Sequence, residues 1–505
     1  MLPQADTPWT LAEAAHLLNR AGFGGNPDEI AKLHALGRGP AVELLLNPAE
    51  PLGKFPLPDW TSDEQAQKDN AMFADKRREI RKGTSGMAPE EAEKAKREAQ
   101  KTLQQEMRRR GLEAQGWWFR RMLMTEAPLR EKMTLFWHDH FATSVQKVKQ
   151  PTLMIHQNEL FRRNAFASFR ELTKLILMDG AMLVYLDTQS SKKDHPNENF
   201  AREVMELFTL GEGNYTEQDI HEAARAFTGF NFNRATGKVA LNKRQWDETD
   251  KTIFGQTGPF DGKGVIDLIF KKREAAVFMA KKIWEFFVYE NPPSAAVDVL
   301  ADAFQKSDFQ VGPLLREIFL SKEFYSPAAM RSQIKSPVQF LISMLKELEV
   351  QNPPNGFPTT AQQQLGQMLF LPPNVAGWDW GKAWINTNTL LTRYNLAGFL
   401  TKGAADMENA MTQADKIPGI GRGPKNVGAG WQGPNYEKIA PRPLREDPAM
   451  LVDSLVMRFF QGPVPDKARD SFVEYAKSKQ GVIFTNQETA ELCHLILSTP
   501  YYQLC

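Results

Sequence analysis

The amino-acid sequence predicts a mainly α-helical protein, a multi-helical bundle with long irregular loops. Apolar residues recur at helical spacing along most of the 505 residues, and few segments alternate apolar and polar residues as a half-buried strand does. Helix-start signals support this prediction. Thr10 is followed three residues later by Glu13, and Thr216 by Asp219, in the pattern of a capping box. A chain of this length can bury a large core.

Residues 1–262 are expected to form an N-terminal helical region that contains the candidate site. Its first helix is predicted to begin at Thr10 and to end at the glycines of residues 22–25. Residues 63–110 form a charged arm, crowded with Lys, Arg, Glu and Gln of alternating sign. This pattern is typical of a long solvated helix, here interrupted near residues 83–86, and a binding surface is the alternative.

A short hairpin is predicted near residues 231–245. It lies within residues 231–262, which are rich in Asn, Gly and Thr, and its turn is expected around Thr236-Gly237-Lys238. The two cysteines, Cys493 and Cys505, are close enough in sequence to form a disulfide, but a chain of this size does not need one. Their pairing therefore stays open.

The second half of the chain divides into three regions. Residues 263–350 and 444–505 are predicted to be two helical repeat units, and residues 351–443 an aromatic loop region rich in Pro and Gly. The repeat is indicated by the similarity of residues 315–325 to residues 492–502. Each of these segments follows an apolar helix at about the same distance, which indicates two copies of one unit.

The bulk composition excludes some partners. Lys and Arg number 62 against 61 Asp and Glu, so no overall charge favours nucleic acid or an anionic membrane. No apolar run reaches the roughly 18 residues of a membrane span. The first residues lack a secretory signal pattern. We therefore expect a cytoplasmic location by default, or a periplasmic one if the chain is exported with a partner.

The helix predicted from Asn199 to Leu210 carries the strongest candidate site. At about 100° per residue, its polar residues fall within one arc of roughly 100°, opposite an apolar stripe. These candidate catalytic residues are Asn199, Arg202, Glu203 and Glu206. The alternative is a surface helix held by ion pairs four residues apart, Glu198 with Arg202 and Arg202 with Glu206.

A metal site is a second hypothesis. His138 and His140 form a His-x-His pair, and with an acid from elsewhere, such as Glu203, they would supply ligands for a divalent metal. Two residues apart, the rings point about 200° away from each other on a helix but the same way on an extended segment. The alternative is two histidines near a helix end without a metal.

An aromatic loop is the third candidate. Trp378 and Trp384, with Asp379 and Asn386 beside them, are the residue types that bind a sugar, whose faces are apolar and whose edges are polar. The alternative is that the rings only fix the loop to the core. The chain has no P-loop, dinucleotide fingerprint, zinc-protease motif or nucleophile elbow.

Several of these segments resemble a bacterial family known as domain of unknown function 1800. The resemblance rests on residues 17–24, 128–141, 196–229, 372–378 and 384–387. It implies a largely helical fold. It also implies a companion protein that resembles sulfatases and phosphatases, since genes of the two families often occur together. Family members often have His where this chain has Phe208, which weakens a metal site built on Glu203 and Glu206.

These observations lead to two functional hypotheses. The first is a hydrolytic enzyme of extracytoplasmic glycan or polymer metabolism, with His138, His140 and Glu203 lining its site together with Arg202 and Glu206. One glutamate would act as general base and Arg202 would hold an anionic group, with a divalent metal as the cofactor. The alternative is a non-catalytic accessory or binding protein that works with the sulfatase-like companion.

Overall fold

Helices dominate the structure, a computed structural model, and confirm the predicted mainly α class. The structure describes residues 1–62, 64–65, 67–68, 72, 78, 89–232, 239–354, 356–403, 431, 433–462, 464–479 and 484–505. In this part of the chain the strands form only two small antiparallel hairpins. Within the same residues, no helix has the length and apolar character needed to cross a membrane.

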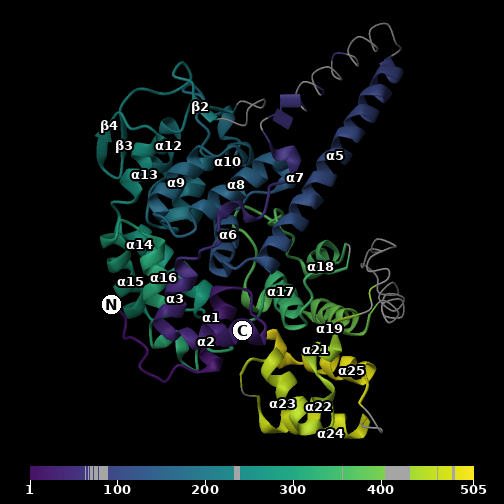
Figure 1. Ribbon diagram of the computed structural model, residues 1–505. Helices are drawn as coiled ribbons and strands as arrows, with labels where there is room; N and C mark the ends of the chain where they lie inside the picture. Colours follow the sequence, from purple (N-terminus) through teal and green to yellow (C-terminus); the bar gives the residue numbers. More distant parts are fainter. Residues whose placement is uncertain are drawn as a thin grey trace.

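The N-terminal region is a group of helices packed around the buried helix α6 (Figure 1). Thr10 and Thr216 each begin a helix with the predicted capping box. The helices of this region are α1 (Leu11–Ala21), α2 (Pro27–Leu36), α3 (Arg38–Leu46), η1 (Leu52–Lys54), η2 (Asp59–Thr61), α5 (Pro89–Met124), α6 (Pro128–His140), α7 (Val145–Val148), α8 (Pro151–Arg163), α9 (Phe169–Leu177), α10 (Gly180–Tyr185), η3 (Thr188–Ser190), α11 (Asn199–Glu203), η4 (Val204–Thr209) and α12 (Glu217–Ala226).

The charged arm contains the first part of α5, which projects from the body of the molecule (Figure 1). Its side chains there are exposed and paired along the helix, as Arg97 is with Glu93 at 2.6 Å. Further along, Trp118 and Met122 are fully buried, so the same helix ends in the core. The solvated helix is therefore confirmed for the described side chains from residue 90 to 105, Arg110 already being buried, whereas the predicted interruption at residues 83–86 lies outside the described residues.

Two hairpins follow α12. Strands β1 (Phe230–Phe232) and β2 (Val239–Leu241) pair antiparallel and confirm the predicted hairpin, although its turn at residues 236–238 lies outside the described part. Strands β3 (Lys251–Ile253) and β4 (Gln256–Gly258) form a second hairpin that the sequence did not predict. Both residues of its turn, Phe254 and Gly255, have positive φ, which is the backbone of a type I′ turn.

The two predicted repeat units have the same element order: three helices and then a short 3₁₀ helix. In each unit every helix contacts the other two. That they are two copies of one unit stays a prediction. The first unit contains α14 (Arg273–Phe287), α15 (Ser294–Lys306), α16 (Val311–Phe319) and η5 (Glu323–Tyr325), and the second α23 (Pro448–Phe459), α24 (Asp466–Lys479), α25 (Asn486–Leu497) and η7 (Pro500–Gln503).

The remaining elements connect these units. They are α13 (Gly262–Ile269), α17 (Pro337–Glu347), α18 (Phe357–Leu365), η6 (Gly381–Trp384), α19 (Thr387–Lys402), α21 (Tyr436–Ile439) and α22 (Arg442–Arg445). Most of the predicted Gly/Pro-rich loop before α21 lies outside the described residues. One hydrophobic cluster contains residues from all four predicted regions, which therefore share a core.

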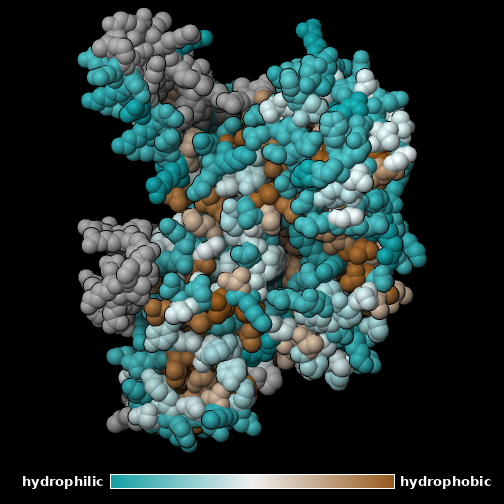
Figure 2. All heavy atoms as spheres, turned by 180° about the vertical axis from the view of Figure 1, so that it is seen from behind, coloured by the Kyte–Doolittle hydropathy of each residue, from teal (hydrophilic) through white to brown (hydrophobic). Residues whose placement is uncertain are grey.

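The surface seen from behind is mainly hydrophilic, with hydrophobic residues in separate patches (Figure 2).

Cys493 and Cys505 are both buried and free, so they do not form a disulfide. Burial raises the pKa of the Cys493 thiol to about 12, and this side chain therefore packs as a small apolar group.

Candidate functional site

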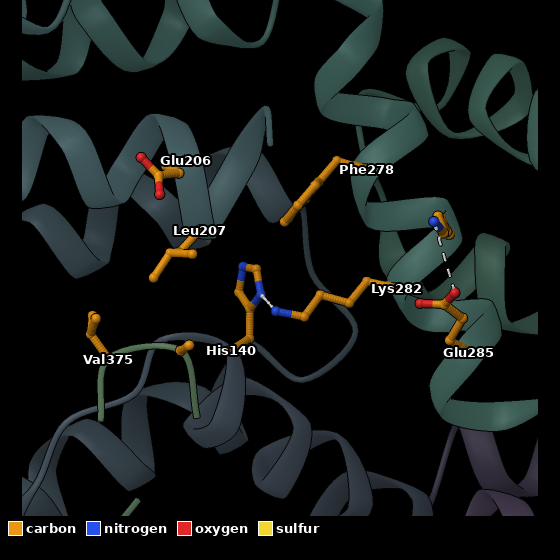
Figure 3. Close-up of a pocket in the computed structure, with 9 residues that line it drawn as sticks. His140, Glu206, Leu207, Phe278, Lys282, Glu285 and Val375 are labelled. Carbon is orange, nitrogen blue, oxygen red and sulfur yellow. Dashed lines mark hydrogen bonds and ion pairs between the residues drawn. The ribbon is translucent and has the colours of Figure 1, made fainter. Parts of the chain in front are cut away.

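A pocket of about 330 Å³ lies where four segments meet: the end of α6, the turn η4, helix α14 and the loop before η6 (Figure 3). Its size is within the range of small-molecule sites. Its lining combines apolar side chains with histidine, lysine and glutamate. The lining residues are His140, Glu206, Leu207, Phe278, Lys281, Lys282, Glu285, Val375 and Ala376.

A lysine–histidine pair occupies the centre of the pocket (Figure 3). The Lys282 Nζ atom lies 3.1 Å from His140 Nδ1, and His140 Nε2 lies 3.0 Å from the carbonyl oxygen of Phe208. A carbonyl only accepts, so Nε2 carries the proton and Nδ1 accepts from the ammonium. Burial and the charge of Lys282 lower the pKa of His140 well below its ordinary value. The imidazole is therefore neutral and holds the ammonium in place.

The Lys282 ammonium is a partly buried cation of this pocket. Burial lowers its pKa, and the more distant charges of Asp139 and Glu285 oppose that shift. Among the described residues, no carboxylate oxygen forms an ion pair with Nζ. The Phe278 ring, whose centroid is 5.7 Å away, adds a cation–π contact. A partly buried amine beside a histidine is the kind of perturbed group that gathers at functional sites.

The turn η4 is a π-helix that continues from α11. The Leu210 N–H donates to the Met205 carbonyl at 2.9 Å, five residues back. Such π segments are rare and frequent at functional sites. Here the turn places Glu206 and Leu207 in the pocket and leaves the Phe208 carbonyl for His140. This is a correction to the sequence analysis, which assumed regular α-helical geometry through Glu206.

The four predicted catalytic residues therefore do not share one site. Arg202 lies on the surface and donates to Glu217 at 2.9 and 2.7 Å, a partner that the sequence did not predict. Of the two predicted ion pairs, Glu198 lies 3.6 Å from Arg202, whereas Glu206 accepts from Tyr215. Asn199 is exposed at the start of α11. Glu203 is partly buried; burial and the charge of Glu206 raise its pKa. Of the four, only Glu206 lines the pocket.

The predicted metal ligands also lie apart. His138 and His140 are on helix α6, where residues two apart point in nearly opposite directions. No group of three His, Cys, Asp or Glu side chains in the described residues is arranged to hold a metal ion. The geometry therefore does not bring His138, His140 and Glu203 into one metal site.

His138 occupies an aromatic environment of its own. Its ring lies 5.3 Å from Trp118, 5.4 Å from Phe370 and 5.7 Å from Trp378, between ring centroids. Burial lowers its pKa to about 3. Neither ring nitrogen has a hydrogen-bond partner within the described part of the chain. The side chain therefore packs as a neutral ring in the core.

The aromatic loop favours the structural interpretation. Trp378 is 4% exposed and Trp384 8%, so neither ring offers a face to a sugar. The Asn386 side chain caps α19, accepting from Thr389 N at 3.0 Å. Asp379 is exposed and does not line the pocket. The loop still contributes to the pocket, through the two residues Val375 and Ala376.

A family model described as "Protein of unknown function (DUF1800)" matches residues 16–504. The chain belongs to this family. The match covers nearly the whole sequence and confirms the resemblance seen in the sequence motifs. Comparisons with curated proteins and with solved structures give no match. The family description states no activity, so the function of this family member must be argued from its pocket.

Asp139 fixes the aromatic loop to α6 beside the pocket. Its Oδ1 atom accepts from the Trp378 N–H at 2.7 Å. Gly377 permits this approach, since its φ is +92° and a Cβ there would lie 2.6 Å from the Asp139 carbonyl oxygen. Burial raises the pKa of Asp139 to about 7, although the Trp378 N–H and Lys282 oppose the shift.

Replacing this carboxyl group, Asp139→Asn, is expected to stabilise the protein above pH 7. The raised pKa means that the folded protein binds the Asp139 proton more tightly than the unfolded chain does. The resulting stability is complete below the ordinary pKa of 3.8 and is lost as the pH rises through 7. Each pKa unit corresponds to about 1.4 kcal/mol. Urea unfolding of both proteins from pH 4 to 9 measures this, and a pH-independent difference would contradict it.

Sequence reasoning missed the residues that α14 contributes. Lys282 lies four residues from Phe278 and from Phe286, both partly buried, and so interrupts a row of aromatic residues on one helix. A lysine in a row of aromatic residues was the sequence signal that could have indicated a buried charge at this position. It stayed unnoticed because two adjacent lysines, Lys281 and Lys282, resemble the solvated face of a surface helix.

Proposed function

We propose that the pocket is the active site of a hydrolase that acts on a glycan or related polymer by general acid–base chemistry. The observation that supports this proposal is the Lys282–His140 hydrogen bond, 3.1 Å long, in a pocket that also contains Glu206. A cation and a carboxylate in one partly enclosed site provide the two elements that hydrolysis needs. These are a base that takes a proton from the attacking water and an acid that protonates the leaving-group oxygen as the glycosidic C–O bond breaks.

Glu206 is the general base in this proposal. The Tyr215 hydroxyl donates to its Oε2 atom at 2.7 Å. One donor leaves most of the lone pairs of a carboxylate available, so the group can accept a proton from water. The Tyr215 contact also fixes the orientation of the side chain. Glu203, next to it on the helix, does not line the pocket and has no part in the reaction.

Lys282 is the general acid and His140 is the positioning residue. The ammonium faces the pocket, and burial lowers its pKa, so it would donate a proton to the leaving-group oxygen while Glu206 takes one from the attacking water. His140 holds it through Nδ1 and is itself held by the Phe208 carbonyl. The order of contacts, backbone to imidazole to amine, resembles that of a catalytic group oriented by a second and a third group.

The glycan or polymer substrate is supported by the family resemblance, which links this chain to a sulfatase-like companion. The volume of about 330 Å³ suits one unit of a polymer rather than an extended segment. The competing assignment is a non-catalytic accessory protein of that companion. In that case the pocket would bind a ligand without converting it.

Release of reducing ends from neutral, uronic-acid-containing and sulfated polysaccharides tests the proposal. His140→Gln is expected to lower kcat about ten- to a hundredfold with little change in KM, because a misplaced catalytic group slows the chemical step more than binding. His195→Gln is the matched control, since His195 is exposed and outside the pocket. Absence of turnover on every polymer, together with co-purification of the companion at fixed stoichiometry, would favour the accessory role.

A further inference from the structure

The Lys282 ammonium lacks the neutralising partner that a partly buried cation ordinarily has. Its hydrogen-bond acceptor is the imidazole of His140, which is neutral. In Figure 3 the side chain extends from α14 toward that ring at the centre of the pocket. Taking a charge out of water is costly unless an opposite charge compensates for it. A partly buried charge of this kind costs folding free energy, so it is expected to serve binding or catalysis.

The acidic groups nearest to Lys282 are each engaged elsewhere. Glu206 accepts from the Tyr215 hydroxyl at 2.7 Å. Glu285 is 4.0 Å from Lys281 on the same helix. Asp139 accepts from the Trp378 N–H at 2.7 Å. Because its pKa is about 7, Asp139 is only partly ionised near neutral pH. None of the three forms an ion pair with Lys282.

We propose that the pocket binds an oxyanion, a carboxylate, sulfate or phosphate group, on the Lys282 ammonium. Lys281, exposed at the rim, adds a second positive charge that attracts the anion without enclosing it. If the proposed hydrolase activity is correct, the substrate is an acidic polymer, and this group belongs to the sugar unit held in the pocket. Anion binding itself does not depend on that activity.

Thermal unfolding with added anions tests this site. Sodium acetate, sulfate and phosphate are each titrated against sodium chloride at equal ionic strength, which separates specific binding from screening. The wild-type midpoint is expected to rise with the concentration of at least one oxyanion beyond the chloride control. Which anion is most effective distinguishes a carboxylate site from a sulfate or phosphate site.

Three variants identify the residue responsible. Lys282→Met keeps the shape of the side chain without its charge and is expected to weaken oxyanion binding about tenfold or more. Lys281→Met, on the adjacent exposed position, should keep the wild-type response, and Lys282→Arg should retain part of it. If Lys282→Met folds poorly, Lys282→Gln, which removes the charge but keeps a polar group beside His140, takes its place in the comparison with Lys281→Met.

The outcomes separate the two proposals. An equal response of Lys282→Met and wild type, or no wild-type response beyond chloride, would overturn the anion site. Oxyanion binding that depends on Lys282, without hydrolysis of any acidic or neutral polymer, would leave the anion site standing and overturn the hydrolase. Hydrolysis of neutral polymers alone, without an oxyanion effect, would do the reverse.

Discussion

Replacement of Glu131 by glutamine is expected to destabilise the protein by about 3–5 kcal/mol, the cost of removing one partner from a buried ion pair. Glu131 is fully buried on α6 and accepts from two arginines. Arg121 Nε lies 2.9 Å from its Oε1 atom, and Arg162 Nε and Nη2 lie 2.6 and 2.8 Å from Oε1 and Oε2. Arg121 and Arg162 are also fully buried. Without the Glu131 charge, Glu159 would be the one carboxylate among the described residues left to pair with both cations.

The two arginines also set the pKa of Glu131. Burial by itself would raise it, but Arg162 and Arg121 hold it below the ordinary value. The stability from this ion pair is therefore present at neutral pH and is lost as the pH falls through that lowered pKa. Glu131→Gln should remove this acid dependence as well as the stability.

Urea unfolding at pH 7 measures the effect, and Glu93→Gln is the matched control. Glu93 pairs with Arg97 at 2.6 Å, but both side chains are exposed, and such pairs contribute little. We expect the control to change stability by less than about 0.5 kcal/mol. A similarly small loss for Glu131→Gln would show that the two arginines find other partners, and the network would then not be essential to the core.

The fold could be predicted from the sequence to the extent that its signals are local. The helix starts at Thr10 and Thr216 depend on residues three positions apart, and the first hairpin depends on one short segment. The hairpin formed by β3 and β4 was missed because its turn residue Phe254 adopts a positive φ that its side chain does not favour. At this turn the packing of the folded chain, and not the local sequence, determines the backbone conformation.

The site was harder to predict because its parts come from distant segments. His140, Glu206, Lys282 and Val375 lie in four different elements, and their neighbourhood is set by the packing of those elements. Sequence reasoning placed His140 and Glu206 in one proposed site, but together with His138, Arg202 and Glu203, which do not line the pocket, and without Lys282. The π-helical turn separated Glu206 from Arg202 and Asn199. The same turn leaves available the Phe208 carbonyl, which His140 contacts. The spacing of residues along a helix does not predict such a contact between distant segments.

The largest expected effect on function is that of Glu206→Gln. Once a hydrolysed polymer is identified, this change should lower kcat about 10²- to 10⁴-fold, because it removes the general base and keeps the shape of the side chain. The glutamine oxygen can still accept from the Tyr215 hydroxyl, which donates to Glu206 at 2.7 Å in the unsubstituted protein. We therefore expect the unfolding temperature to change little, and a loss of activity without a loss of stability identifies a chemical role.

Glu203→Gln is the control that makes this test decisive. The two glutamates are three residues apart, but Glu203 does not line the pocket. If the pocket is the active site, Glu203→Gln retains activity within a fewfold of wild type. If Glu203→Gln loses activity and Glu206→Gln retains it, the base lies on the other side of the helix and the pocket is not where the reaction occurs. Equal, small effects of both changes would instead show that neither glutamate is the general base.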